Sequence, residues 1–403
     1  MSASGLSADT ASRAPLTARA VFAILKRIRH GSLALTTPDG ETHLFTGPEP
    51  GTRADLQMLD WKVASELMRS ADIAMGECYR DGRLKSSDWT ALLIFFVENA
   101  QPLEDVFYGN KLAVLYYRLL HWLRSNSKRQ ARKNISAHYD LSNDFYKLWL
   151  DPTMTYSSGV GVSGKDMEAA QQAKYDRILH LLDPKPGEHI LEIGCGWGGF
   201  AERAAKTRGV KVTGITLSEA QLAFAQARMK REGLDHLVTL KLVDYRDVKE
   251  QFDHIASIEM FEAVGEQYWQ TYFSKVHECL KPGASAVIQA ITIAEDAFPR
   301  YRETSDFIRE YIFPGGMLAP VPRFRADAER AGLRSEAPFM FGIDYADTLA
   351  FWRDRINAVE AEVKALGFDE KFLRIWRFYL CYCEAGFRTG RTDVMQIQLT
   401  RPA

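Results

Sequence analysis

The chain lacks any hydrophobic run that approaches the roughly 20 residues needed to cross a bilayer, although 46% of its 403 residues are hydrophobic. Its first 20 residues contain no apolar core of signal-peptide length, so we expect a protein that is not exported. Cysteine is scarce, since the five thiols are scattered and no pair has the spacing of a zinc site. The sequence thus predicts reduced thiols, a cytoplasmic location and no bound metal.

The chain also has almost no net charge, with a formal value of −1 at pH 7. This balance argues against bulk attraction to an anionic partner, and we expect no nucleic acid to bind. The charges are unevenly placed, however, because residues 118–133 carry six basic side chains and no acidic one. This basic stretch fits either a solvated helix face and linker or a patch for anionic phosphate head groups.

The hydrophobic pattern divides the chain into three parts, without internal repeats or extended low-complexity tracts. Residues 1–17 read as a polar lead-in that we expect to be disordered. Residues 18–125 predict a smaller, mostly helical domain, with one hairpin turning at Asp39-Gly40 and a long amphipathic helix near its end. Residues 126–403 form the larger, C-terminal part.

In the C-terminal part, apolar strand-like segments alternate with amphipathic helix-like segments from about residue 184. Such alternation predicts an α/β fold with a parallel sheet and right-handed crossovers. In sheets of this kind the ligand lies over the carboxyl ends of the strands. The residues that follow each strand are therefore the candidates for a functional site.

The first informative strand runs into the glycine-rich stretch LEIGCGWGGF, which precedes a helix. Its glycines also satisfy the dinucleotide spacing, so the loop alone indicates a nucleotide-like ligand, and a purely structural strand–turn–helix is the alternative. The next strand ends in GITLSEAQ, where a nicotinamide enzyme would place a carboxylate for the ribose hydroxyls. Ser218 and Gln221 instead resemble a helix capping box, with Glu219 already inside the helix. The pattern favours an S-adenosylmethionine methyltransferase over a nicotinamide-dependent reductase.

A second informative strand, HIASIEMFEAVG, is followed by Glu262 inside an apolar run. Burying a carboxylate is costly unless it is paired or hydrogen-bonded. Glu262 is therefore either a cap or salt-bridge partner, or a site carboxylate held over the sheet near the transferred methyl group.

Six segments, in this order, resemble the cyclopropane fatty acid synthase family, which includes the mycolic acid cyclopropane synthases and related lipid C-methyltransferases. The segments are AHYDLSNDFYKLWLDPTMTYSSG, LEIGCGWGGF, GITLSEAQ, SIEMFEAVG, FIREYIFPGGML and DYADTLAFW. The match covers residues 134–403, and residues 18–125 resemble the lipid-binding domain of longer members less distinctly. The resemblance implies a class I methyltransferase (Rossmann-like) sheet with a lid at 134–160 and an acyl-chain cover at about 295–345.

The resemblance also implies that S-adenosylmethionine is the co-substrate. The residues expected to bind it lie in the lid and at the strand ends, namely Tyr156, Ser157, Glu192, Gly194, Gly196, Gly198, Thr216, Leu217, Gln221, Tyr245 and Arg246. Methyl transfer to an unactivated alkene produces a carbocation that water would trap, so the site must exclude water. Aromatic faces stabilise a cation without reacting with it, which suits the aromatic-rich lid.

The family uses a bound bicarbonate ion to remove a proton from the new methyl group. By resemblance, its ligands fall on Glu262, Tyr345 and the backbones of Ser158 and Ile291. The resemblance also places His138 and Tyr139 in the lining of the cavity and Cys383 near the site, and Gln289 stands where the family has a histidine. The full candidate catalytic set is Glu262, Tyr345, Gln289, Ile291, Ser158, His138 and Cys383.

This chain departs from the family pattern at three positions. Ser158 replaces a cysteine, and both Gln289 and Ala263 replace histidines. Glutamine donates a hydrogen bond to an anion but cannot relay a proton. These changes leave methyl transfer intact as an expectation and leave the product open between a cyclopropane and a methyl- or methylene-branched chain.

The sequence thus predicts an enzyme that transfers a methylene or methyl group from S-adenosylmethionine to the cis double bond of unsaturated acyl chains in membrane phospholipids. It would work in the cytoplasm at the inner face of the membrane, either as a homodimer or as a single chain. The alternatives are a C-methyltransferase giving a branched chain, a nicotinamide-dependent reductase, and a non-catalytic lipid-binding module. The last has no need of Glu262 or of the glycine loop.

Overall fold

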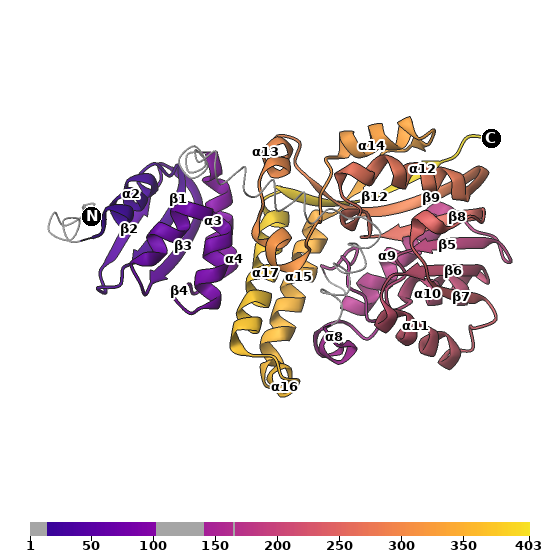
Figure 1. The fold of residues 1–403 in the computed structure, drawn as a ribbon, viewed down its shortest axis with the longest axis horizontal. Coiled ribbons are helices and arrows are strands. Elements are labelled where there is room, and N and C mark those ends of the chain that lie inside the picture. The colour runs from indigo at the N-terminus through magenta and orange to yellow at the C-terminus, as the bar shows by residue number, and fades with distance from the viewer. Residues whose placement is uncertain (1–13, 102–140, 164–165) are drawn as a thin grey trace.

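The computed structural model describes residues 14–101, 141–163 and 166–403. These residues form a small N-terminal domain and a larger C-terminal domain, which lie side by side with a pair of long helices at their junction (Figure 1). Several expectations fall outside the described residues: the first 13 residues, the long amphipathic helix, the basic stretch 118–133, and the side chains of His138 and Tyr139.

The N-terminal domain combines helices with a four-stranded sheet of order β2-β1-β3-β4. Its elements are α2 (Leu16–Leu25), β1 (His30–Thr36), β2 (Thr42–Thr46), β3 (Glu49–Met58), α3 (Lys62–Arg80), β4 (Leu84–Lys85) and α4 (Trp89–Glu98). The hairpin at Asp39-Gly40 is confirmed, because Thr36 pairs with Thr42 on either side of it. The strands after the hairpin were not expected in a mostly helical domain, and α2 begins inside the expected lead-in.

The C-terminal domain is built on one large sheet of order β10-β12-β9-β8-β5-β6-β7. Its strands are β5 (His189–Ile193), β6 (Lys211–Thr216), β7 (Val238–Leu242), β8 (Phe252–Ile258), β9 (Leu280–Ile293), β10 (Arg334–Ser335), β11 (Phe339–Met340) and β12 (Thr392–Thr400). Strands β5 to β9 are parallel, as predicted, and β12 is antiparallel to β9. The chain order reverses between β5 and β8, and a ligand crevice is expected at such a point.

Helices cover both faces of this sheet (Figure 1). The helices of the C-terminal domain are α8 (Asn143–Trp149), α9 (Met167–Leu182), α10 (Gly199–Arg208), α11 (Glu219–Arg231), α12 (Trp269–Cys279), α13 (Phe298–Glu303), α14 (Val321–Arg330), α15 (Gly342–Ala358), α16 (Glu360–Ala365) and α17 (Glu370–Arg388). Two short turns matter for the site: a 3-10 turn at Phe261–Ala263 and a π-helical turn at Ile308–Ile312.

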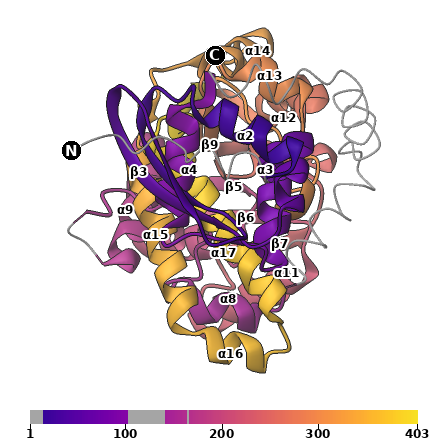
Figure 2. The same ribbon diagram turned by 90° about the vertical axis from the view of Figure 1, so that its left-hand side faces the viewer.

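The two domains share one hydrophobic core, because α3 and α4 pack against α17 (Figures 1 and 2). The contact is close: a Cβ added at Gly76 in α3 would lie 2.4 Å from the ring of Phe307. Polar bonds also cross the boundary, since Asp72 accepts hydrogen bonds from Phe307 N (3.1 Å) and Tyr382 Oη (2.9 Å). The N-terminal domain therefore forms part of the wall around the C-terminal site.

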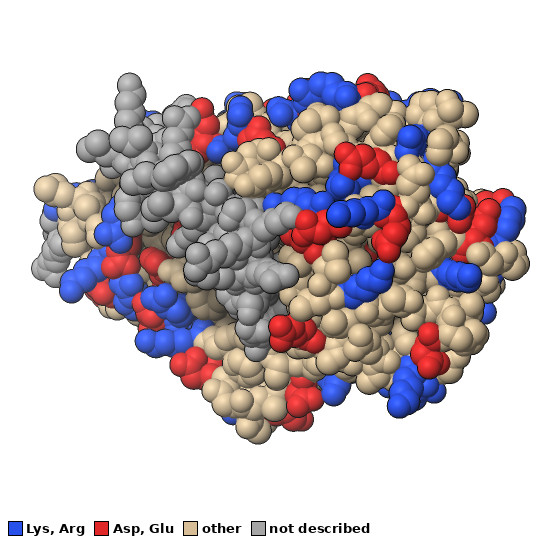
Figure 3. Space-filling model, turned by 45° about the vertical axis from the view of Figure 1, so that its right-hand side comes forward, with Lys and Arg blue, Asp and Glu red and all other residues tan. Residues whose placement is uncertain are grey.

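Charges on the surface are mixed in sign. On the face shown in Figure 3, Lys and Arg side chains are interspersed with Asp and Glu. Among the described residues, no helix is both long enough and apolar enough to span a bilayer.

Candidate active site

Two adjoining cavities lie over the carboxyl ends of the parallel strands. The smaller, of about 160 Å³, is lined by the glycine loop and by the ends of β5 and β6. The larger, of about 420 Å³, extends from the C-terminal domain into the N-terminal domain. Three residues line both cavities, namely Tyr156, Glu259 and Ala263. A group transferred between two ligands would pass at this junction.

Most residues expected to bind S-adenosylmethionine line the small cavity. The structure brings nine of them together there: Tyr156, Ser157, Glu192, Gly194, Gly196, Thr216, Leu217, Gln221 and Tyr245. Gly198 and Arg246 are outside that lining. Gly198 lets α11 approach, because a Cβ there would lie 3.2 Å from Ala225 Cβ. Arg246 instead pairs with Asp244 at 2.6 Å.

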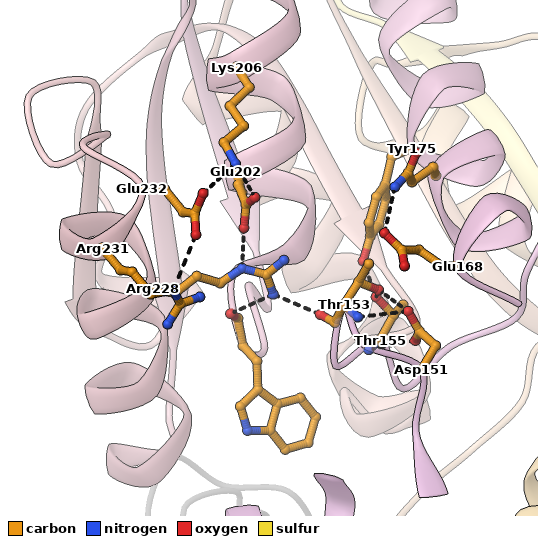
Figure 4. Close-up of polar contacts among 12 residues, drawn as sticks. Asp151, Thr153, Thr155, Glu168, Tyr175, Glu202, Lys206, Arg228, Arg231 and Glu232 are labelled. Atoms are coloured by element: carbon orange, nitrogen blue, oxygen red, sulfur yellow. Dashed lines mark hydrogen bonds and ion pairs between the residues drawn. The ribbon is translucent and has the colours of Figure 1, made fainter.

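The lid segment beside the glycine loop is held by polar contacts (Figure 4). Arg228 of α11 donates to the carbonyl of Thr153 at 2.7 Å and forms an ion pair with Glu202 of α10. Thr155 is hydrogen-bonded to Tyr175 of α9 at 2.9 Å. These bonds fix the backbone just before Tyr156 and Ser157, and both of these residues line the small cavity.

The aromatic side chains of the lid divide into two groups. Phe145, Tyr146 and Trp149 are fully buried in the core beside α15 and α17. Tyr156 alone of the described lid aromatics reaches the cavities, and its hydroxyl is 2.7 Å from that of Tyr379. Most of this aromatic content therefore anchors the segment, and one ring faces the ligand space.

Glu192 provides an acceptor at the floor of the small cavity. It lies at the end of β5, is 3% exposed, and its Oε2 atom has no hydrogen-bond partner among the described residues. Burial raises its pKa well above the usual value. The end of β6 carries no carboxylate; there Thr216 donates to Gln221 at 3.1 Å. The end of β6 thus lacks the carboxylate that the ribose hydroxyls of a dinucleotide would require.

The bicarbonate ligand set expected from the sequence converges on a protein carboxylate, Glu259. Its Oε1 atom accepts hydrogen bonds from Ser158 N (2.9 Å) and Gln289 Nε2 (2.7 Å). Its Oε2 atom accepts from Tyr345 Oη (2.6 Å). These donors were expected to act with Glu262, which contacts only Ile291 N of that set.

The strand register explains why these donors contact Glu259. Ile258, the last residue of β8, pairs with Gln289 of β9, so the next residue points its side chain at Gln289. Glu259 also has a left-handed backbone (φ 50°), which is uncommon outside glycine and concentrated at functional sites. Glu262 lies in the following 3-10 turn and faces the neighbouring backbone N–H of Ile291.

The two buried carboxylates have different environments. Burial, followed by the negative charge of Glu259, raises the pKa of Glu262 to about 8. Burial also raises the pKa of Glu259. The positive charge of Lys174 and the three donors that hydrogen-bond to Glu259 oppose that rise. We therefore assign the negative charge at neutral pH to Glu259 and the proton to Glu262.

Replacing Glu262 by Gln is expected to change how stability depends on pH. Glu262 binds its proton more tightly in the folded chain (pKa about 8) than at its ordinary pKa of 4.5, so this contribution to stability is fully present below pH 4.5 and lost as pH rises through 8. The wild type should therefore lose this contribution from pH 5 to pH 9, and Glu262→Gln should not. The free energy of unfolding of Glu262→Gln, relative to that of the wild type, should rise by about 3–5 kcal/mol from pH 5 to pH 9. Urea unfolding at both pH values measures this. Glu250→Gln, at an exposed ion pair, is the control, and equal pH profiles for wild type and Glu262→Gln would contradict the assignment.

The remaining candidate catalytic residues also have defined positions. Gln289 is fully buried, and its Oε1 atom accepts a hydrogen bond from Gln396 (2.9 Å), which orients its amide toward Glu259. Cys383 lines the large cavity, and burial raises the pKa of its thiol, so it stays protonated. Of the expected cover at 295–345, the stretch 300–318 and Tyr345 line the large cavity.

Three further residues of the site were not identified from the sequence: Glu259, Lys174 and Gln396. Lys174 is fully buried and donates to Ser157 Oγ (2.5 Å) and Gln171 Oε1 (2.6 Å). Burial lowers its pKa to about 7. The available signal for Glu259 was its position directly after a strand, and none marked Lys174 or Gln396, which lie within regular elements.

The chain is similar to lipid-modifying enzymes over most of its length. The sequence pattern described as mycolic acid cyclopropane synthetase matches residues 126–397. Tuberculostearic acid methyltransferase of Mycobacterium tuberculosis is 38% identical over 360 residues, which cover 84% of this chain and 81% of that protein. Cyclopropane-fatty-acyl-phospholipid synthase of Escherichia coli is 34% identical over 352 residues, covering 86% and 88%. A crystal structure of a mycolic acid cyclopropane synthase complexed with SAH and CTAB has a TM-score of 0.63 and 32% identity, covering 67% of this chain and 98% of that one.

Proposed function

The chain belongs to the mycolic acid cyclopropane synthetase family, whose relatives are S-adenosylmethionine-dependent lipid methyltransferases, and on that premise we propose that it methylates the cis double bond of unsaturated acyl chains in membrane phospholipids. The observation that carries the proposal is that the small cavity at the glycine loop and the large, mostly apolar cavity meet at Glu259. One cavity suits the methyl donor and the other suits the acyl chain.

The small cavity fits S-adenosylmethionine, which supplies an electrophilic methyl group on a positively charged sulfur. Glu192 would accept a hydrogen bond from the ammonium group through its unpartnered Oε2 atom. Gly194 and Gly196 allow the ligand to approach the backbone of the loop. Tyr156 presents its ring at the side shared with the large cavity, where it can stabilise positive charge.

The large cavity suits the acyl chain because its lining is mostly apolar. Ile291, Phe313 and Leu349 form its wall near the carboxylates. A mostly apolar wall, filled by the acyl chain, limits the access of water to the carbocation that methyl transfer creates on the chain. The negative charge of Glu259 stabilises that cation in a low-dielectric site.

Glu259 is placed to accept the proton that must leave the new methyl group. When it takes this proton, the electrons of the C–H bond form the third bond of a cyclopropane ring. Three hydrogen bonds hold the carboxylate in position. The residues do not fit a separate bicarbonate ion, because Ser158 N, Gln289 and Tyr345 are already bonded to Glu259.

Turnover is accordingly expected to be independent of bicarbonate. The wild-type rate in buffer purged of carbon dioxide should equal the rate with bicarbonate restored, because the base belongs to the chain. Radiolabelled methyl transfer to dioleoyl phospholipid vesicles measures both rates. Several-fold stimulation by bicarbonate would show that the ion, and not Glu259, removes the proton.

A branched product is a second candidate, favoured by the 38% identity to tuberculostearic acid methyltransferase. If a hydride migrates from the methylated carbon to the adjacent cationic carbon before Glu259 removes the methyl proton, the electrons of that C–H bond form a C=C bond, and the product is a chain with a methylene branch. Proton NMR of the reacted lipid separates ring methylene from olefinic methylene protons, although both products have the same mass. If the protein binds S-adenosylmethionine but forms neither product, the proposed function is overturned.

We also propose that the enzyme works at the inner face of the membrane and that the basic stretch 118–133 attaches it there. Each Lys or Arg near an anionic surface contributes about 1 kcal/mol, which salt screens. Changing Arg124, Lys128, Arg129 and Arg132 together to Gln should weaken binding to phosphatidylglycerol vesicles at least tenfold at low salt. Vesicle sedimentation measures this.

A matched control removes the same number of positive charges from two helices of the C-terminal domain. The four residues lie on α10 and α11 and are Arg203, Lys206, Lys230 and Arg231. Vesicle binding should be unchanged in this variant. Equal losses in both variants would mean that overall charge, and not the basic stretch, governs attachment.

A further inference from the structure

Arg309 is a buried cation in the wall of the large cavity. It lies in the π-helical turn Ile308–Ile312 and is 3% exposed. Its Nε atom pairs with Asp306 at 3.0 Å, and its guanidinium stacks on the ring of Tyr301 at 4.1 Å. Both terminal nitrogens, Nη1 and Nη2, have no hydrogen-bond partner among the described residues. Leaving buried donors of a charged group unsatisfied is costly, so this arrangement calls for a ligand.

The charges around Arg309 leave room for an anion. The large cavity is lined by three arginines (Arg300, Arg309 and Arg391) and, away from the catalytic carboxylates, by the acidic side chains of Asp72 and Asp306. Asp72 is engaged by Tyr382 and Phe307 N, and Asp306 faces the Nε side of Arg309. The Nη side of the guanidinium therefore remains for a ligand, and its planar fork matches the oxygens of a phosphate or carboxylate.

Arg309 also lies where the two domains meet. Its neighbour Phe307 donates to Asp72 of α3, and the ring of Phe307 packs against Gly76. On one side of this boundary the cavity wall consists of apolar side chains of the N-terminal domain, among them Leu33, Leu35, Leu56 and Leu93. On the other side the apolar wall leads to Glu259. Each domain thus contributes an apolar part of the cavity wall, which we call an arm, and Arg309 lies at the boundary between the two arms.

We propose that Arg309 binds the phosphodiester of a diacyl phospholipid, with one acyl chain extending to Glu259 and the other entering the N-terminal domain. The inference rests on the proposed function for the identity of the lipid. A free fatty acid also offers an oxyanion, but it has a single chain and would fill one arm. A lipid with two chains and one phosphate matches both arms and the cation, so it is the ligand to which the geometry points.

Binding without turnover tests this inference. Titration calorimetry, with no S-adenosylmethionine present, compares soluble dioctanoylphosphatidylglycerol with dioctanoylglycerol, which has the same chains and no phosphate. The wild type should bind the phospholipid at least tenfold more tightly. Arg309→Gln should remove that difference by weakening the phospholipid alone. The control Arg302→Gln, at an exposed ion pair on α13, should keep it.

Titrations with two further ligands identify the source of the anion. Octanoate supplies a carboxylate on a single chain, and inorganic phosphate supplies the anion without chains. If either binds the wild type as tightly as the phospholipid does, the two-arm assignment is overturned. Equal wild-type affinity for the two dioctanoyl lipids would also overturn it, and that comparison needs no variant.

The buried pair requires a folding control. Removing Arg309 leaves Asp306 without its partner, so Asp306→Asn/Arg309→Gln removes both charges and should show the same loss of phospholipid affinity. Thermal unfolding checks both variants. Because only binding is measured, a chain that binds phospholipid through Arg309 but transfers no methyl group would contradict the proposed function and leave this inference standing. If the wild type transfers methyl groups and Arg309→Gln binds the phospholipid as tightly as the wild type does, this inference fails and the proposed function stands.

Discussion

Glu259→Gln is expected to lower kcat by about 10²- to 10⁴-fold, the range that a positioned general base contributes. Glutamine keeps the size of the side chain and one carbonyl oxygen for Ser158 N, but it cannot accept a proton at neutral pH. S-Adenosylmethionine affinity should change less than tenfold, since most of the small cavity is formed by other residues. Initial rates of radiolabelled methyl transfer and calorimetry of S-adenosylmethionine binding give the two quantities.

Glu262→Gln is the matched control for this prediction. The substitution is chemically the same and lies three residues away, on the wall of the same large cavity. Because its raised pKa of about 8 leaves Glu262 protonated at neutral pH, Gln resembles the form already present. The rate should fall less than tenfold. A larger loss for Glu262→Gln than for Glu259→Gln would show that Glu262 carries the essential charge and would restore the ligand set expected from the sequence.

The parallel core of the sheet was predictable because its signal is local. Each of the strands β5 to β9 is an apolar run followed by a turn or a helix start, and LEIGCGWGGF marks one such end. Ser218 caps α11 by accepting from Gln221 N, as its spacing indicates. Gln221 returns its side chain to Thr216 and not to the backbone of Ser218, so half of the expected capping box is wrong.

The position of Glu259 was not predictable from its neighbours in sequence. IEMFEA offers two carboxylates three residues apart, and only the pairing of Ile258 with Gln289 decides which one meets the donors. Those donors come from the lid, from β9 and from α15, which are far apart along the chain. The reach of the large cavity into the N-terminal domain depends likewise on how α3 and α4 pack against α17. Long-range register and packing of this kind leave no local pattern.

Gly194→Ala is expected to weaken S-adenosylmethionine binding by more than tenfold. Gly194 follows β5, has φ +86°, and lines the small cavity. A Cβ at this position would lie 3.0 Å from both Cβ and Cγ of Met260, which lines the same cavity. The loop would have to shift into the space that the ligand requires. Gly196 is a weaker test, because a Cβ there would meet no atom within 4 Å.

Gly187→Ala separates backbone strain from loss of the binding site. Gly187 has φ +87°, nearly that of Gly194, but a Cβ there would meet no atom within 4 Å, and the residue lies outside the small cavity. Both variants should lose about 1 kcal/mol of stability, since a left-handed backbone disfavours any residue with a Cβ. Only Gly194→Ala should also lose S-adenosylmethionine affinity in calorimetry. Equal affinities in the two variants would mean that the loop tolerates a Cβ beside Met260, and the methyl donor would then have to bind elsewhere than against this glycine.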